Sequence, residues 1–125
     1  DVYKRQGHYM SPALFLARPE HRVAREEIFG PVACVLRADD YEHALALAND
    51  TPFGLCAGIC TTSLKRAMHF KRHAAVGMTM VNLPTAGVDF HVPFGGRKES
   101  SYGAREQGRY AAEFYTTVKT GYVLA

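Results

Sequence analysis

Short apolar runs and stretches with helical spacing follow one another along the chain. Residues 31–38 include the apolar residues Val32, Cys34, Val35 and Leu36 without polar alternation, which is typical of a strand covered on both faces. After that run, apolar residues return at helical spacing and predict a helix that ends near Asn49. Asp39 and Glu42 have the spacing of a capping box, so we expect them to begin this helix.

The same alternation continues downstream. Residues 55–61 and 77–82 predict two further strands, and between them a helix is expected to run from a cap at Ser63 to about Arg72. Residues 9–15 predict one extended segment ahead of all these elements. Strand, helix, strand, helix, strand is the order that builds crossovers in α/β proteins. The predicted fold class is therefore α/β, with a mixed, mostly parallel sheet.

Residues 83–101 show neither the apolar spacing of a helix nor that of a strand and are rich in Pro and Gly, so we expect a long loop. Structureless loops of this length are usually functional, which makes this one a candidate binding segment. Residues 105–114 predict a last helix, and residues 116–124, rich in Thr, Val and Tyr, are strand-like. No partner strand remains for them, so we expect pairing with a sheet edge from missing chain or from another subunit.

Composition indicates one globular core, since 47% of the 125 residues are apolar. The apolar runs are too short to cross a bilayer, and a cytoplasmic protein without a membrane partner is expected. Lys and Arg total 15 against 12 acidic residues and are spread along the chain, so no nucleic-acid partner is expected. Residues 1–6 are polar and aperiodic, and we interpret them as an extraneous lead.

Three cysteines, an odd number, favour reduced thiols that act as small buried apolar groups: Cys34, Cys56 and Cys60. No further Cys or His pair stands at zinc-site spacing from Cys56 and Cys60, so no metal site is expected. A small thiol enzyme built on Cys56 and His73 is a weaker alternative.

The run Glu-Glu-Ile-Phe-Gly-Pro-Val at residues 26–32 places Glu27 just before a turn that leads into a strand. A carboxylate there can accept two hydrogen bonds from vicinal ribose hydroxyls, roughly 1.5–3 kcal/mol each. Phe29 can cover a nicotinamide ring. The alternative interpretation makes Glu27 a surface carboxylate and Phe29 a core ring.

Residues 26–32 and the later run Pro-Phe-Gly-Gly-Arg-Lys at residues 93–98 resemble the aldehyde dehydrogenase family in their order and approximate spacing. The resemblance implies that Glu27 binds the nicotinamide ribose of NAD or NADP and that Phe29 packs against the nicotinamide. It also implies that the loop lines an aldehyde tunnel in which Phe94 forms an aromatic wall. A core position for Phe94 is the alternative.

Residues 83–92 and 100–120 look most like the 2-oxoglutarate semialdehyde dehydrogenases of this family, although Glu99 and Ala104 depart from that group. The implied substrate is that small aldehyde, with Val88 and His91 as further substrate contacts beside Phe94. His91 is interpreted as a polar wall or a solvent-facing group, because the resemblance assigns the general base to a Glu upstream of these residues.

The resemblance covers only the C-terminal portion of the family's enzymes. It implies a partial catalytic domain at residues 7–115 and an oligomerisation strand at residues 116–125, through which the full-length enzyme forms a homo-oligomer. The family's nucleophilic Cys precedes the segment that matches residues 26–32, so no catalytic residue is expected in this chain. These residues alone are predicted to be inactive. The alternative is a non-catalytic module that joins and regulates a full-length relative.

Overall fold

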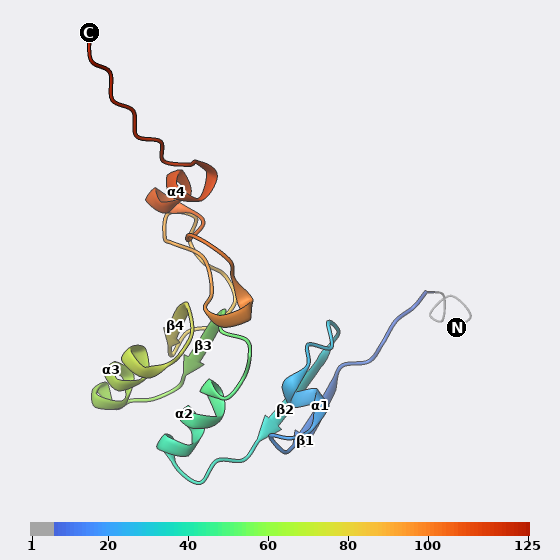
Figure 1. Ribbon diagram of the computed structural model, residues 1–125. Helices are drawn as coiled ribbons and strands as arrows, with labels where there is room; N and C mark the ends of the chain where they lie inside the picture. Colours follow the sequence, from blue (N-terminus) through green and yellow to red (C-terminus); the bar gives the residue numbers. More distant parts are fainter. Residues whose placement is uncertain (1–6) are drawn as a thin grey trace. The chain divides into compact units, whose positions relative to one another are not determined.

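A computed structural model describes residues 7–125, which form two compact units, one ending at Leu47 and one covering residues 48–125 (Figure 1). The predicted extraneous lead, residues 1–6, lies outside the described residues. No helix in the described part is both long enough and apolar enough to cross a membrane.

The first unit contains β1 (Ala13–Ala17), α1 (Arg22–Arg25) and β2 (Val32–Leu36). The two strands pair in parallel, with Ala13 opposite Val32 and Ala17 opposite Leu36. Parallel neighbours need a crossover, and α1 lies within it. The extended segment predicted at residues 9–15 thus forms a strand, β1, which begins and ends later in the chain than predicted. Helix α1 was not predicted, because a single helical turn is too short to show apolar periodicity.

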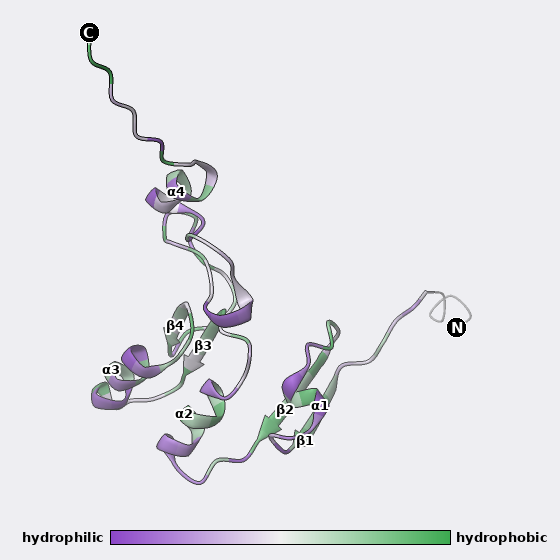
Figure 2. Cartoon of the chain, in the orientation of Figure 1, coloured by the Kyte–Doolittle hydropathy of each residue, from purple (hydrophilic) through white to green (hydrophobic). Residues whose placement is uncertain are grey.

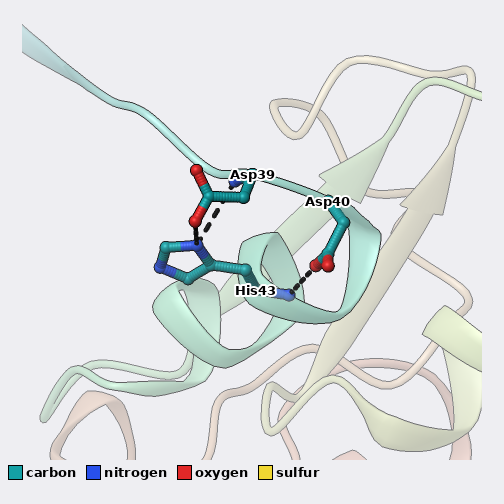
Figure 3. A network of polar contacts seen from close by, with 3 residues as sticks. All are labelled: Asp39, Asp40 and His43. Atoms are coloured by element: carbon teal, nitrogen blue, oxygen red, sulfur yellow. Dashed lines mark hydrogen bonds and ion pairs between the residues drawn. The ribbon is translucent and has the colours of Figure 1, made fainter.

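Helix α2 (Tyr41–Asn49) confirms the first predicted helix, but its cap differs from the prediction. The His43 N–H donates to Asp40 Oδ1 at 2.7 Å, so Asp40 caps the helix (Figure 3). Asp39 instead contacts the imidazole, with its Oδ2 3.2 Å from His43 Nδ1. The predicted Asp39–Glu42 capping box is wrong by one residue, because the cap must directly precede the first helical residue.

The second unit contains β3 (Cys56–Ile59), α3 (Leu64–His73) and β4 (Met78–Val81). The strands pair in parallel, with Cys56 opposite Met78 and Ile59 opposite Val81. The predicted cap of α3 is confirmed, since Ser63 Oγ accepts from the Arg66 N–H at 3.3 Å. Figure 2 shows α3 as largely hydrophilic. The buried apolar side chains of this unit come from α3 and the residues after it: Ala67, Phe70, Ala74 and Val76.

The α/β class is confirmed, and both ladders are parallel. The three strands predicted at residues 31–38, 55–61 and 77–82 all form, each shorter than predicted, but β2 pairs with β1 and β3 pairs with β4 in separate two-stranded sheets. The predicted loop holds one short 3-10 helix, η2 (Lys98–Ser100), and one isolated antiparallel bridge between Phe94 and Glu106.

The last predicted helix begins later than expected. Residues 105–107 are not helical, because Glu106 pairs with Phe94 and Gln107 has a φ of 67°. The helical part consists of η3 (Gly108–Tyr110) and α4 (Ala111–Tyr115). Residues 116–125 form no helix or strand within the described chain, so the pairing of this segment stays a prediction.

Candidate functional site

The two adjacent glutamates of the 26–32 segment have different surroundings. Arg22 holds Glu26 with two hydrogen bonds, Nε to Oε1 at 2.9 Å and Nη2 to Oε2 at 2.7 Å. These bonds keep the pKa of the Glu26 carboxyl below its usual value and raise that of Arg22. The pair spans the single turn of α1, from its first residue Arg22 to its C-cap Glu26, so the Glu26 carboxylate is engaged in the local structure.

Glu27 is exposed and makes no hydrogen bond or ion pair with any described residue. With Phe29 it lines a cavity of about 320 Å³ in the first unit. Phe29 is 90% exposed, so within the described residues its ring is not part of a core. Its φ of 56° lies in the left-handed region, which costs a residue with a Cβ about 1–2 kcal/mol.

The residues of this cavity fit a nicotinamide ribose. Vicinal hydroxyls need an acceptor with two oxygens, and the Glu27 carboxylate is such an acceptor. It has no hydrogen bond to another described residue that binding would have to break. A nicotinamide ring needs an apolar face, and the exposed Phe29 ring offers one. Cys34 lines the same cavity, with its Sγ 3.7 Å from the Val23 carbonyl oxygen.

The predicted substrate residues come from one loop of the second unit. Val88 and Phe94 are half-buried and His91 is exposed. Phe94 is held by its backbone, which exchanges hydrogen bonds of 2.7 and 2.8 Å with Glu106. The His91 ring meets Phe90 edge to face, with centroids 5.4 Å apart. Phe90 is exposed, and no motif or spacing in the sequence selected it as a contact residue.

The two glycines of the 93–98 run let this loop approach the strand ends closely. Gly54 O accepts from the N–H groups of Gly77 and Arg97, each at 2.9 Å. An added Cβ at Gly77 would lie 1.9 Å from the Gly95 carbonyl oxygen. The Arg105 guanidinium donates to Gly96 O. The run therefore fastens the candidate substrate loop to the segments that precede β3 and β4.

Lys98 and Ser100 strengthen this junction. Lys98 Nζ donates to the carbonyl oxygens of Asn49 and Thr51, at 2.7 and 2.9 Å. Ser100 Oγ accepts from the Gly54 N–H at 2.8 Å. The base of the loop is thus held by polar contacts, and the predicted contact residues Val88 and His91 lie in the part that precedes the junction.

All three cysteines are free thiols, with Cys34 and Cys56 half-buried. Cys60 is exposed, so its predicted burial is wrong, because β3 ends at Ile59 and Cys60 lies just beyond it. In the described residues no hydrogen bond joins Cys56 to His73, whose Nδ1 lies 2.8 Å from His69 O. No cluster of three metal-ligating side chains occurs in the described part of the chain.

Sequence comparisons identify relatives for nearly the whole chain. A model of the Aldehyde dehydrogenase family matches residues 2–121, so the match begins inside the predicted lead. The alpha-ketoglutaric semialdehyde dehydrogenase of Bacillus subtilis (strain 168) is 43% identical over 118 residues, which are 94% of this chain and 24% of that protein. The aminoacetaldehyde dehydrogenase of Pseudomonas aeruginosa is 45% identical over 82% of this chain and 20% of its own length.

Solved structures agree. Gamma-glutamyl-gamma-aminobutyraldehyde dehydrogenase from Burkholderia cenocepacia J2315 superposes with a TM-score of 0.85 at 40% identity, over 94% of this chain and 24% of that one. An indole-3-acetaldehyde dehydrogenase in complex with NAD+ gives 0.85 at 38% identity, over 95% and 24%. The chain thus spans about a quarter of the length of these relatives. Because the family match covers almost all of it, the chain belongs to the aldehyde dehydrogenase family.

Proposed function

We propose that this chain supplies the nicotinamide side and the substrate loop of an NAD- or NADP-dependent aldehyde dehydrogenase that oxidises an aldehyde to a carboxylate. The observation that carries the proposal is the unpaired Glu27 carboxylate, which shares a cavity with the exposed Phe29 ring. The relative solved with NAD+ supports this choice of cofactor.

Glu27 accepts the hydroxyls of the nicotinamide ribose, and Phe29 packs against the nicotinamide. When bound, the dinucleotide supplies the acceptor for the hydride of the substrate. Phe29 has a left-handed backbone and an apolar ring that is exposed. The hydrophobic effect alone would favour burial of this ring, and the strained backbone holds it at the surface. Exposure and strain at this residue are both accounted for by a planar ligand that covers the ring.

The substrate is 2-oxoglutarate semialdehyde. Phe94 and Val88 supply apolar walls, and His91 can donate a ring N–H to the carboxylate end of the substrate. Support for this substrate comes from the Bacillus subtilis relative named above and from an alpha-ketoglutarate semialdehyde dehydrogenase of Haloferax volcanii, also 43% identical.

The nucleophile is supplied by protein outside these 125 residues, so the chain alone does not turn over substrate. The family's nucleophilic Cys precedes the segment that matches residues 26–32, whereas all three cysteines of this chain follow Glu27. Cys34 and Cys56 also lie within strands. The complete enzyme is cytoplasmic and assembles as a homo-oligomer through residues 116–124. The exposed apolar side chains of that segment support the assembly.

The test compares Glu27→Gln with Glu26→Gln in the full-length protein that carries this sequence. Loss of one charge-assisted acceptor pair is expected to lower kcat/KM for the dinucleotide by about tenfold or more. Glu26→Gln serves as the matched control and is expected to change it little, because that carboxylate is already bound to Arg22. Steady-state formation of NADH or NADPH gives the readout.

The aldehydes in this assay are 2-oxoglutarate semialdehyde, aminoacetaldehyde and betaine aldehyde, and the first is expected to give the highest kcat/KM. The isolated chain of 125 residues is expected to show no activity with any of these aldehydes. Equal losses in Glu26→Gln and Glu27→Gln would contradict the cofactor role of Glu27, and a preference for another aldehyde would contradict the substrate.

A further inference from the structure

A second cavity of the first unit lies at the opposite end of β2 from Glu27 and Phe29. It has a volume of about 770 Å³ and is lined by Leu16, Ala17, Arg18, Pro19, His21 and Arg37. β1 ends at Ala17 and β2 at Leu36, so these residues gather at the carboxyl ends of two parallel strands. That edge is where α/β sheets usually bind small ligands.

The strand register brings two arginines together at this edge. Ala17 and Leu36 are opposite each other, and Arg18 and Arg37 are the next residues of their strands. Neither guanidinium has a hydrogen bond or ion pair with any described residue. An arginine stays charged in proteins, so the cavity holds two permanent cations without an internal counter-ion. Glu20 and Asp39, the nearest acids in sequence, are exposed and do not line the cavity.

His21 adds a ring donor to the two cations. The Arg18 backbone N–H donates to His21 Nδ1 at 3.3 Å, which leaves the Nε2–H of the ring as its donor. Arg25 Nε donates to Pro19 O at 2.5 Å and holds the loop that carries His21. Two guanidinium forks and one imidazole N–H are thus available in one cavity, and all three can only donate.

We propose that this cavity binds the phosphate group of a small organic molecule. The planar guanidinium fork matches the oxygens of a phosphate, and a dianion balances two arginines. Leu16, Ala17 and Pro19 supply apolar surface for the rest of the molecule. The volume lies within the roughly 300–1,000 Å³ of small-molecule sites. The site stands apart from the dinucleotide role of Glu27 and does not depend on it.

The test is calorimetric titration of the full-length protein with inorganic phosphate, acetate and phenyl phosphate. Phosphate is expected to bind more tightly than acetate because of its second charge, and phenyl phosphate more tightly still because of the apolar wall. Arg18→Gln and Arg37→Gln are each expected to weaken phosphate binding about tenfold, the effect of one lost charge-assisted hydrogen bond. Arg72→Gln, an exposed arginine of α3, is the matched control and leaves binding unchanged.

Undiminished phosphate binding in the Arg18→Gln, Arg37→Gln double variant would overturn the proposal, as would absence of binding to the unaltered protein at millimolar phosphate. Equal affinity for acetate would overturn the assignment to phosphate. If a glutamine variant does not fold, Arg18→Lys and Arg37→Lys keep the charge but lose the fork, and they are expected to weaken phosphate binding by a smaller factor.

Discussion

Gly77 is the residue at which the backbone tolerates least change. Its position before β4 lies against the two glycines of the substrate loop, and a Cβ there would stand 1.9 Å from Gly95 O and 2.7 Å from Gly96 Cα. Both are backbone atoms, which cannot rotate away. We expect Gly77→Ala to reduce the free energy of unfolding by about 3 kcal/mol, the upper range for overpacking. Urea unfolding of the full-length protein measures the loss.

Gly30→Ala is the matched control for that substitution. No heavy atom lies within 4 Å of an added Cβ at Gly30, so the unfolding midpoint is expected to stay unchanged. A Gly77→Ala protein as stable as the Gly30→Ala protein would show that the junction between the loop and the segments before β3 and β4 is loose.

At the scale of elements, the cap of α2 distinguishes two adjacent aspartates. Asp40 accepts the His43 N–H, whereas Asp39 meets only the His43 side chain on the surface (Figure 3). Asp40→Ala is expected to cost about 1 kcal/mol of unfolding free energy, and Asp39→Ala a few tenths. Thermal unfolding of the two variants side by side provides the measurement, and a larger effect from Asp39→Ala would restore the capping box predicted from the sequence.

The elements that could be predicted are those with a run of apolar residues at one period. β2, α2, α3 and β4 all lie where runs or helical spacing of apolar residues indicated them. α1 has one turn and is held by Arg22 and Glu26, a contact between charged residues that apolar spacing does not reveal. The start of α4 was displaced because Glu106 pairs with Phe94, a partner 12 residues away.

The candidate site follows the same rule. Glu27 and Phe29 could be selected from a short contiguous motif, and their role as cofactor contacts stays a prediction. The cavity of Arg18 and Arg37 could not be selected in this way. Its two arginines are far apart in the sequence, and only the pairing of Ala17 with Leu36 reveals that they are neighbours.

At the scale of the whole molecule, residues 116–125 present apolar side chains that this chain does not cover. Val118, Tyr122, Val123 and Leu124 are 95 to 100% exposed. Each would gain up to about 1.5–3 kcal/mol on burial, so we expect this uncovered segment to pair as a strand with a second subunit. Proline at a paired position removes one ladder hydrogen bond and fixes φ, which weakens such pairing.

We therefore expect proline substitution to reduce the mass of the full-length assembly measured by light scattering. Because alternate N–H groups of a strand face one partner, Lys119→Pro and Thr120→Pro are made separately, and at least one of them should yield a smaller species. Lys119→Ala and Thr120→Ala keep the backbone N–H and should retain the original mass. If both proline variants keep that mass at every protein concentration, residues 116–124 do not hold the subunits together, and the exposed apolar side chains must be covered within one subunit.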